Sequence, residues 1–141
     1  MKCLIVVFGV ICLLASGVAA EVNSIPVFKP ACFKHDSIIL SKSARLNLDL
    51  VARIVLEQPG LSLTLIGHTD DRRTEEYALA LGDRLTKVVM NYLTQAGVQP
   101  LRITTSSHGK SKPAGSRQAK TVRDCNNLVE IIAQAGEKPL Q

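Results

Sequence analysis

The residues of this chain that are best suited to chemistry lie in one stretch, L-T-L-I-G-H-T-D-D-R-R-T-E-E-Y, at positions 63–77. An alternating apolar run, typical of a half-buried strand, ends there in His68, Thr69 and Asp70. An imidazole, a hydroxyl and a carboxylate at the end of a strand have three interpretations. They are acid–base catalysis, capture of a polar ligand, or a capped turn before a helix.

Catalysis has little support elsewhere in the sequence. Asp71 follows Asp70 directly and faces elsewhere, so no second carboxylate is placed to work with the first. The sequence has no glycine-rich phosphate loop and no nucleophile elbow. We therefore expect a protein that is not an enzyme and needs no cofactor. Asp70 can also accept hydrogen bonds from nearby backbone N–H groups, and this interpretation stands beside ligand capture.

Apolar runs in the sequence predict the strands that position this stretch. Four strands are predicted, at residues 27–33, 61–66, 101–105 and 128–132. Pro30 places the first of them at a sheet edge or a bulge.

Two helices are predicted between these strands. The first is capped by Ser41 or Ser43 and stopped by Pro59-Gly60, and the second begins after Thr74 and ends at Gly97. The first helix is expected to bury one stripe: Leu46, Leu50, Val51, Ile54 and Val55. The second carries a longer one: Tyr77, Leu81, Leu85, Val88, Val89, Tyr92 and Leu93. Residues 106–116 are expected to form a surface loop, and residues 117–123 can form a short helix. The order predicts an α/β sandwich with helices on one face of a mixed sheet.

Residues 1–20 predict a secretory signal peptide. Lys2 precedes an apolar core, and small residues follow it, so we expect cleavage after Ala20. The alternative is a retained anchor, but roughly a dozen apolar residues fall short of the ~20 that span a bilayer. A lipid anchor at Cys12 would need a small residue where the chain has Ile11.

The chain without its signal is mildly basic. The full sequence has a formal charge of +5, and loss of Lys2 reduces it to +4. The late basic residues are Lys110, Lys112, Arg117, Lys120 and Arg123. Export and an aromatic content of 4% argue against a nucleic-acid partner. Such a face suits an anionic wall polymer or lipid headgroups, or it is simply a solvated loop.

Four cysteines become two after export. Cys3 and Cys12 leave with the signal, and Cys32 and Cys125 remain. An even pair in an oxidising compartment favours one disulfide, and two buried free thiols are the alternative. A loop of roughly 90 residues closed in this way is worth on the order of 4 kcal/mol.

Four segments together resemble the OmpA-like domain. They are G-H-T-D-D-R-R-T-E-E-Y-A-L-A-L-G-D-R-L, N-Y-L-T-Q-A-G-V, I-T-T-S-S-H-G-K-S-K-P and L-V-E-I-I. That family includes the C-terminal domain of outer membrane protein A, the peptidoglycan-associated lipoprotein and flagellar motor stators. The resemblance places the domain at residues 27–134, between a leader at 21–26 and a tail at 135–141. It implies the order strand-helix-strand-helix-strand-strand, with the last strand antiparallel between the first two.

The resemblance also implies a site. In the family an aspartate of the H-T-D turn holds the ammonium of diaminopimelate in the wall peptide, and an arginine on the next helix holds its carboxylate. The aspartate corresponds to Asp70, with Gly67, His68 and Thr69 shaping the turn and Thr69 offering its backbone. A fixed anion and a fixed cation are what a zwitterion requires.

The chain departs from the family pattern at the cation. The family arginine corresponds to Leu85. The neighbouring Arg84 is a candidate to bind the ligand in its place, although on a helix it points about 100° away. Further departures are Ala78 in place of asparagine, and Asn127 and Leu128 in place of two arginines. These changes predict a modified, weakened pocket.

The implied topology brings other residues together. Cys32 and Cys125 would lie at adjoining ends of antiparallel neighbours, which favours their pairing. His35, His68 and His108 would each follow a parallel strand and line one edge. Their spacings match no compact metal motif, so we expect no metal site.

We therefore expect a non-enzymatic periplasmic domain of a Gram-negative-type envelope, near the outer membrane, that associates with peptidoglycan. An envelope protein complex is a second expected partner, and no membrane-spanning segment is expected after signal cleavage. The alternative is a structural subunit of a secretion machine or motor collar that has lost wall binding.

Overall fold

The computed structural model describes residues 24–69, 73–110, 125 and 127–136. It contains helices α1 (Lys42–Glu57) and α2 (Glu75–Gln95) and a short 3-10 helix η1 (Pro100–Arg102). The strands are β1 (Ala31–Phe33), β2 (Leu61–His68), β3 (Ile103–Gly109) and β4 (Asn127–Ala135). Both helices begin at predicted caps: the Ser41 hydroxyl accepts the Ala44 N–H at 3.1 Å, and the Thr74 hydroxyl accepts the Tyr77 N–H at 3.3 Å.

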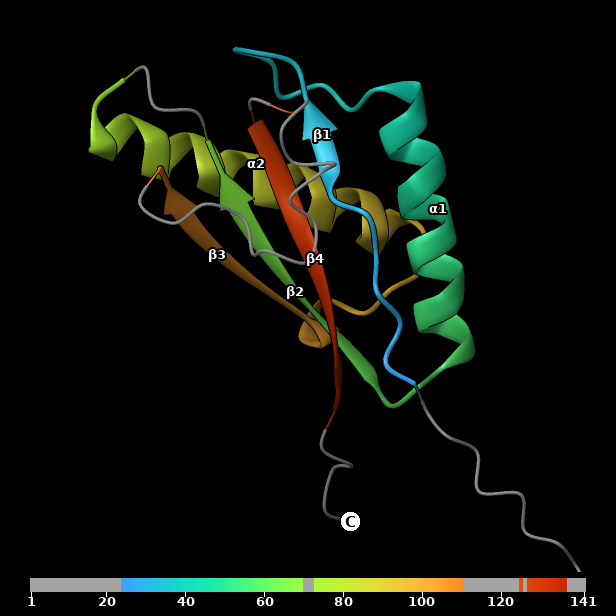
Figure 1. The fold of residues 1–141 in the computed structure, drawn as a ribbon. Coiled ribbons are helices and arrows are strands. Elements are labelled where there is room, and N and C mark those ends of the chain that lie inside the picture. The colour runs from blue at the N-terminus through green and yellow to red at the C-terminus, as the bar shows by residue number, and fades with distance from the viewer. Residues whose placement is uncertain (1–23, 70–72, 111–124, 126, 137–141) are drawn as a thin grey trace, which may run out of the picture.

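The strands form one mixed sheet in the order β1-β4-β2-β3. β4 lies antiparallel between β1 and β2, and β3 runs parallel to β2 at the other side (Figure 1). The predicted fold class and the position of the last strand are therefore confirmed. The carboxyl ends of β1, β2 and β3 meet at one edge of the sheet, where both helices begin (Figure 1).

Several predicted strand boundaries were wrong. β2 and β4 extend beyond the predicted residues 66 and 132, to His68 and Ala135. β1 has only three residues, because the chain before Pro30 makes only an isolated bridge between Val27 and Ile132. β3 begins at Ile103, after η1, and Leu101 is 98% exposed. β3 then continues through Ser106–Gly109, which were assigned to a loop, because parallel pairing with β2 satisfies this polar backbone. The remaining predicted loop and the short helix at 117–123 fall mostly or wholly outside the described residues.

The core lies between the sheet and the two helices. Leu63 and Leu65 of β2 meet Val51 and Val55 of α1 there, with exposures of 1% or less. The predicted α1 stripe was partly wrong, because Leu46 and Leu50 are 62% and 50% exposed. The buried face of α1 consists of Ala44, Leu48, Val51, Ala52 and Val55. No helix in the described part of the chain combines the length and the apolar character that a membrane crossing requires.

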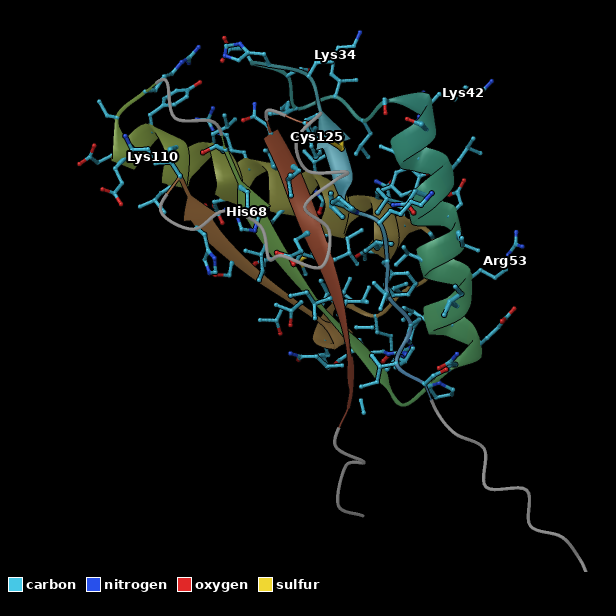
Figure 2. The ribbon with its side chains drawn as sticks, in the orientation of Figure 1. Lys34, Lys42, Arg53, His68, Lys110 and Cys125 are labelled. Carbon is cyan, nitrogen blue, oxygen red and sulfur yellow. A yellow bond between two sulfur atoms is a disulfide. The ribbon has the colours of Figure 1, made fainter. Side chains whose placement is uncertain are left out.

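A covalent link ties β1 to the start of β4. Cys32 and Cys125 form a disulfide, with their Cα atoms 5.6 Å apart, and its sulfur lies beside β1 in Figure 2. Cys32 is paired in register with Leu128, three residues beyond Cys125. The predicted disulfide is therefore confirmed.

Candidate functional site

The H-T-D turn begins where β2 leaves the sheet. Gly67 and His68 are the last residues of β2, and Thr69 follows them. The Thr69 N–H donates to the Gly109 carbonyl at 3.0 Å, and its hydroxyl donates to the Ala78 carbonyl at 3.4 Å. The Thr69 N–H is thus engaged within the fold, so any backbone group that Thr69 offers a ligand is its carbonyl. Asp70, the expected anion, lies outside the described residues.

Gly67 sets the distance between β2 and α2. A Cβ at this position would lie 2.8 Å from the Cα of Gly82 and 2.7 Å from its carbonyl carbon. Two glycines facing each other therefore let the strand that carries the turn lie directly against the helix. This contact fixes the turn relative to the residues of the first half of α2.

His68 and His108 lie together at the end of the sheet. Their ring centroids are 5.6 Å apart in an edge-to-face arrangement, and His68 Nε2 lies 3.1 Å from Glu130 Oε2. Figure 2 labels His68, the last residue of β2. The residue is 7% exposed, and the Glu130 carboxylate compensates the burial of its polar ring. His35 instead pairs with Asp36, at 3.1 Å. Within the described residues no three His, Cys, Asp or Glu side chains are grouped so that they could hold a metal ion.

A small recess lies beside the turn, between the loop after β1 and the first turns of α2. Its lining consists of His35, Asp36, Thr69, Arg73, Tyr77, Ala78, Leu81 and Asn127. Three residues that the sequence singled out, Thr69, Ala78 and Asn127, are therefore brought together here. Its volume is about 10 Å³, which is space for about one water molecule.

An ion pair lies at this recess. Arg73 Nη2 donates to Asp36 Oδ1, and the guanidinium lies over the Tyr77 ring, 4.4 Å from its centroid. Asp36 has φ of 53°, in the left-handed region that aspartate tolerates better than most residues. The pair joins the loop after β1 to the turn before α2.

Asp36 and Arg73 are site residues that no motif in the sequence predicted. The second arginine of D-D-R-R-T was a visible signal at the turn. Nothing in the sequence, however, indicated that its partner lies 37 positions earlier.

The residue at the family's cation position belongs to the core. Leu85 is 0% exposed and packs among the buried residues between α2 and the sheet, and it does not line the recess. Arg84 is exposed and also absent from the recess lining. Arg84 therefore stays a predicted ligand residue that lies outside the described lining of the recess.

The other departures are buried as well. Ala78 is 1% exposed, and Asn127 and Leu128 are each 2% exposed at the start of β4. Of these three, Ala78 and Asn127 line the recess and Leu128 does not. In the described part of this wall, small and neutral groups stand where the family pattern has larger polar or basic ones.

A wider cavity, of about 720 Å³, lies on the other side of the loop after β1. It is lined by Cys32, Phe33, Lys34, His35, Ser37, Ile39, Leu40, Ser41, Lys42 and Cys125. Neither His68 nor Thr69, the described residues of the H-T-D motif, lines this cavity. The smaller recess is therefore the candidate site, because Thr69 of the H-T-D turn lines it.

A four-stranded mixed sheet backed by two helices, with this recess at the carboxyl end of β2, defines an OmpA-like domain. The OmpA family matches residues 32–127, and the chain belongs to this family.

Relatives by sequence include two peptidoglycan-associated lipoproteins. The protein from Pseudomonas aeruginosa is 37% identical over 99 residues, which are 70% of this chain and 58% of the relative. The protein from Legionella pneumophila is 32% identical over 103 residues, 73% of this chain and 58% of the relative. The chain thus matches less than two thirds of the length of these relatives.

Solved structures show the same fold. The peptidoglycan-associated lipoprotein from Burkholderia pseudomallei superposes with a TM-score of 0.66 at 26% identity, covering 75% of this chain and 90% of that one. The C-terminal domain of Helicobacter pylori MotB superposes with a TM-score of 0.64 at 27% identity, covering 76% and 84%.

Proposed function

We propose that this protein is a non-enzymatic component of the bacterial envelope that associates with peptidoglycan through the recess beside the H-T-D turn. The observation that carries the proposal is the convergence of Thr69, Ala78 and Asn127, residues from three separate segments of the chain, on one recess. Relatives named for their association with peptidoglycan support the choice of ligand. Periplasmic location after export, near the outer membrane, belongs to the same proposal.

The chemistry of the ligand suits the end of the molecule that contains the recess, at the carboxyl end of β2. A wall peptide carries both ammonium and carboxylate groups, so it needs an anion and a cation at close range. Asp70 is the proposed anion for the ammonium. Lys34, Lys42 and Lys110 lie at this end of the molecule, whereas Arg53 lies along α1 (Figure 2). Exposed lysines of this kind raise the local concentration of an anionic polymer and speed encounter.

The recess, with the small volume that it has in this structure, is expected to bind the wall peptide weakly. It holds about one water molecule, and the buried Leu85 offers no charge to a carboxylate. These two observations also favour a second function, in which the domain is a structural subunit of an envelope complex and has lost wall binding. The two proposals differ in whether the isolated domain binds peptidoglycan.

Co-sedimentation with insoluble peptidoglycan separates these two functions. We expect wild-type protein to pellet with the polymer and Asp70→Ala to lose about tenfold or more in affinity, because a charge-assisted hydrogen bond is lost. Asp71→Ala, which removes the neighbouring carboxylate, is the matched control and is expected to pellet like wild type. Wild-type protein that stays in the supernatant would overturn wall association and leave the structural function.

A further inference from the structure

Arg73 is the guanidinium among the described residues that line the recess. Of the described residues that line it, His35 and Arg73 are the basic ones, and only arginine is charged at every physiological pH. Leu85 is buried in the core and Arg84 is exposed outside the lining. A carboxylate that enters the recess therefore meets Arg73.

The guanidinium is already arranged to hold a carboxylate. Tyr77 lies under it, at 4.4 Å, and the Asp36 carboxylate accepts its N–H. Stacking on an aromatic ring fixes the plane of a guanidinium and leaves its edge to donate hydrogen bonds. The carboxylate of Asp36 thus occupies the place that a ligand carboxylate would take.

Replacement of the Asp36 carboxylate by a ligand carboxylate at Arg73 costs little free energy. The Arg73 and Asp36 side chains are 41% and 45% exposed, so their pairing is worth little in water. After exchange Asp36 keeps a partner, because His35 Nδ1 lies 3.1 Å from its other oxygen. Opening of the pair would also widen a recess that now holds about one water molecule.

We propose that Arg73 binds the carboxylate of the wall peptide in this protein, and that Asp36 is an internal competitor that occupies Arg73 when no ligand is present. This proposal rests on the proposed function. It adds which residue is the cation, and it explains how Asp36 lowers the affinity for the wall peptide. Arg73 is thus a specificity-determining residue for ligands with a free carboxylate.

A matched pair of soluble stem peptides tests this assignment by calorimetry. One peptide has the free side-chain carboxylate of diaminopimelate, and the other has that carboxylate amidated. We expect wild-type protein to prefer the free acid by about tenfold and Arg73→Gln to lose that preference. Asp36→Asn, which tolerates the same positive φ, is expected to bind the free acid two- to fivefold more tightly than wild type, by about the worth of an exposed pair.

Arg53→Gln is the matched control, because it removes an exposed arginine of α1 that does not line the recess (Figure 2). It should keep the wild-type preference. If wild-type protein binds and Arg73→Gln still prefers the free acid by the full factor, the assignment of Arg73 is overturned while wall binding stands. If neither wild type nor Asp36→Asn binds either peptide, both the assignment and the proposed function fail.

Discussion

Residue 85 shows that one substitution can keep the fold of the family while removing a charged group that the family uses to bind its ligand. An arginine at this position would need a carboxylate partner, whereas Leu85 packs among the apolar side chains of the core with no exposed surface. The exchange gives up the charge of the family residue and gains apolar burial in the core. The fold therefore persists while this position offers no group that could bind a carboxylate.

Restoring the family residue is expected to damage the fold. Leu85→Arg places a charge among apolar neighbours, so we expect the free energy of unfolding to fall by about 3–5 kcal/mol, as for an uncompensated buried charge. Urea denaturation followed by circular dichroism measures the change. Arg84→Leu on the exposed face is the control, and its stability should stay within about 0.5 kcal/mol of wild type. Equal stability of Leu85→Arg and wild type would show that the recess admits the arginine.

Tyr92 links the two helices through a pH-dependent bond. Its hydroxyl donates to Asp49 Oδ1 at 2.7 Å, and this bond raises the Tyr92 pKa above its ordinary value of 10.0, with a further contribution from burial. Because the folded-state pKa is the higher one, the stabilisation is complete below pH 10 and is lost as the pH rises through the folded value.

Tyr92→Phe therefore has a pH-dependent effect on stability. We expect it to lower the free energy of unfolding by about 1 kcal/mol between pH 7 and 9. The difference from wild type should shrink above pH 10, once tyrosine ionises in the folded state too. Denaturation curves at several pH values give this comparison, and a difference that stays constant to pH 11 would contradict the assigned bond.

At the scale of elements, helix-capping residues predicted where helices begin more reliably than apolar stripes predicted which helix face is buried. The Ser41 and Thr74 caps are local side-chain bonds, so the sequence predicted both helix starts correctly. The buried face of α1 depends on how the helix lies against the sheet. Leu46 and Leu50 match helical spacing but lie on a neighbouring, solvent-exposed stripe. Parallel pairing with β2 similarly extended β3 through polar residues that no apolar pattern marks.

The contact between β2 and α2 gives an element-scale prediction. Gly67→Ala forces a methyl group against the backbone of Gly82, so we expect a loss of about 1–3 kcal/mol or more in the free energy of unfolding. Gly60→Ala is the control, since nothing lies within 4 Å of its Cβ position and its φ is not positive. It should be neutral or slightly stabilising. Thermal melts of both variants decide the matter, and equal melting temperatures would contradict the close approach.

For the whole molecule, the disulfide and the sheet order act together. β4 is the last strand in sequence but lies between β1 and β2, so its placement closes long loops. The bond between Cys32 and Cys125, 93 positions apart, reduces the entropy of the unfolded chain before that pairing forms.

Removal of the disulfide should lower stability without changing the fold. We expect Cys32→Ala/Cys125→Ala to lose about 2–5 kcal/mol in the free energy of unfolding. Oxidised wild-type protein in the same urea titration is the reference, and reduced wild-type protein should resemble the double variant. If reduction leaves the unfolding midpoint unchanged, the bond does not form in the mature protein.

The sequence predicted the fold, because long ordered motifs and helix caps are local signals. The family pattern marked Thr69, Ala78 and Asn127, which the structure places around one recess, and their part in binding stays a prediction. The pairing of Asp36 with Arg73 could not be predicted, because it depends on how the loop after β1 lies against the turn before α2.

The central claim is that peptidoglycan is bound at the recess, and the most direct test is an NMR titration of the oxidised domain with a soluble stem peptide. We predict concentration-dependent shifts of the backbone amides of Thr69, Arg73, Ala78 and Asn127, which line the recess. The amides of Gly60 and Arg102, at the opposite end of β2 and β3, should stay in place. No shift at any recess amide at saturating peptide, or shifts confined to other surfaces, would contradict the claim.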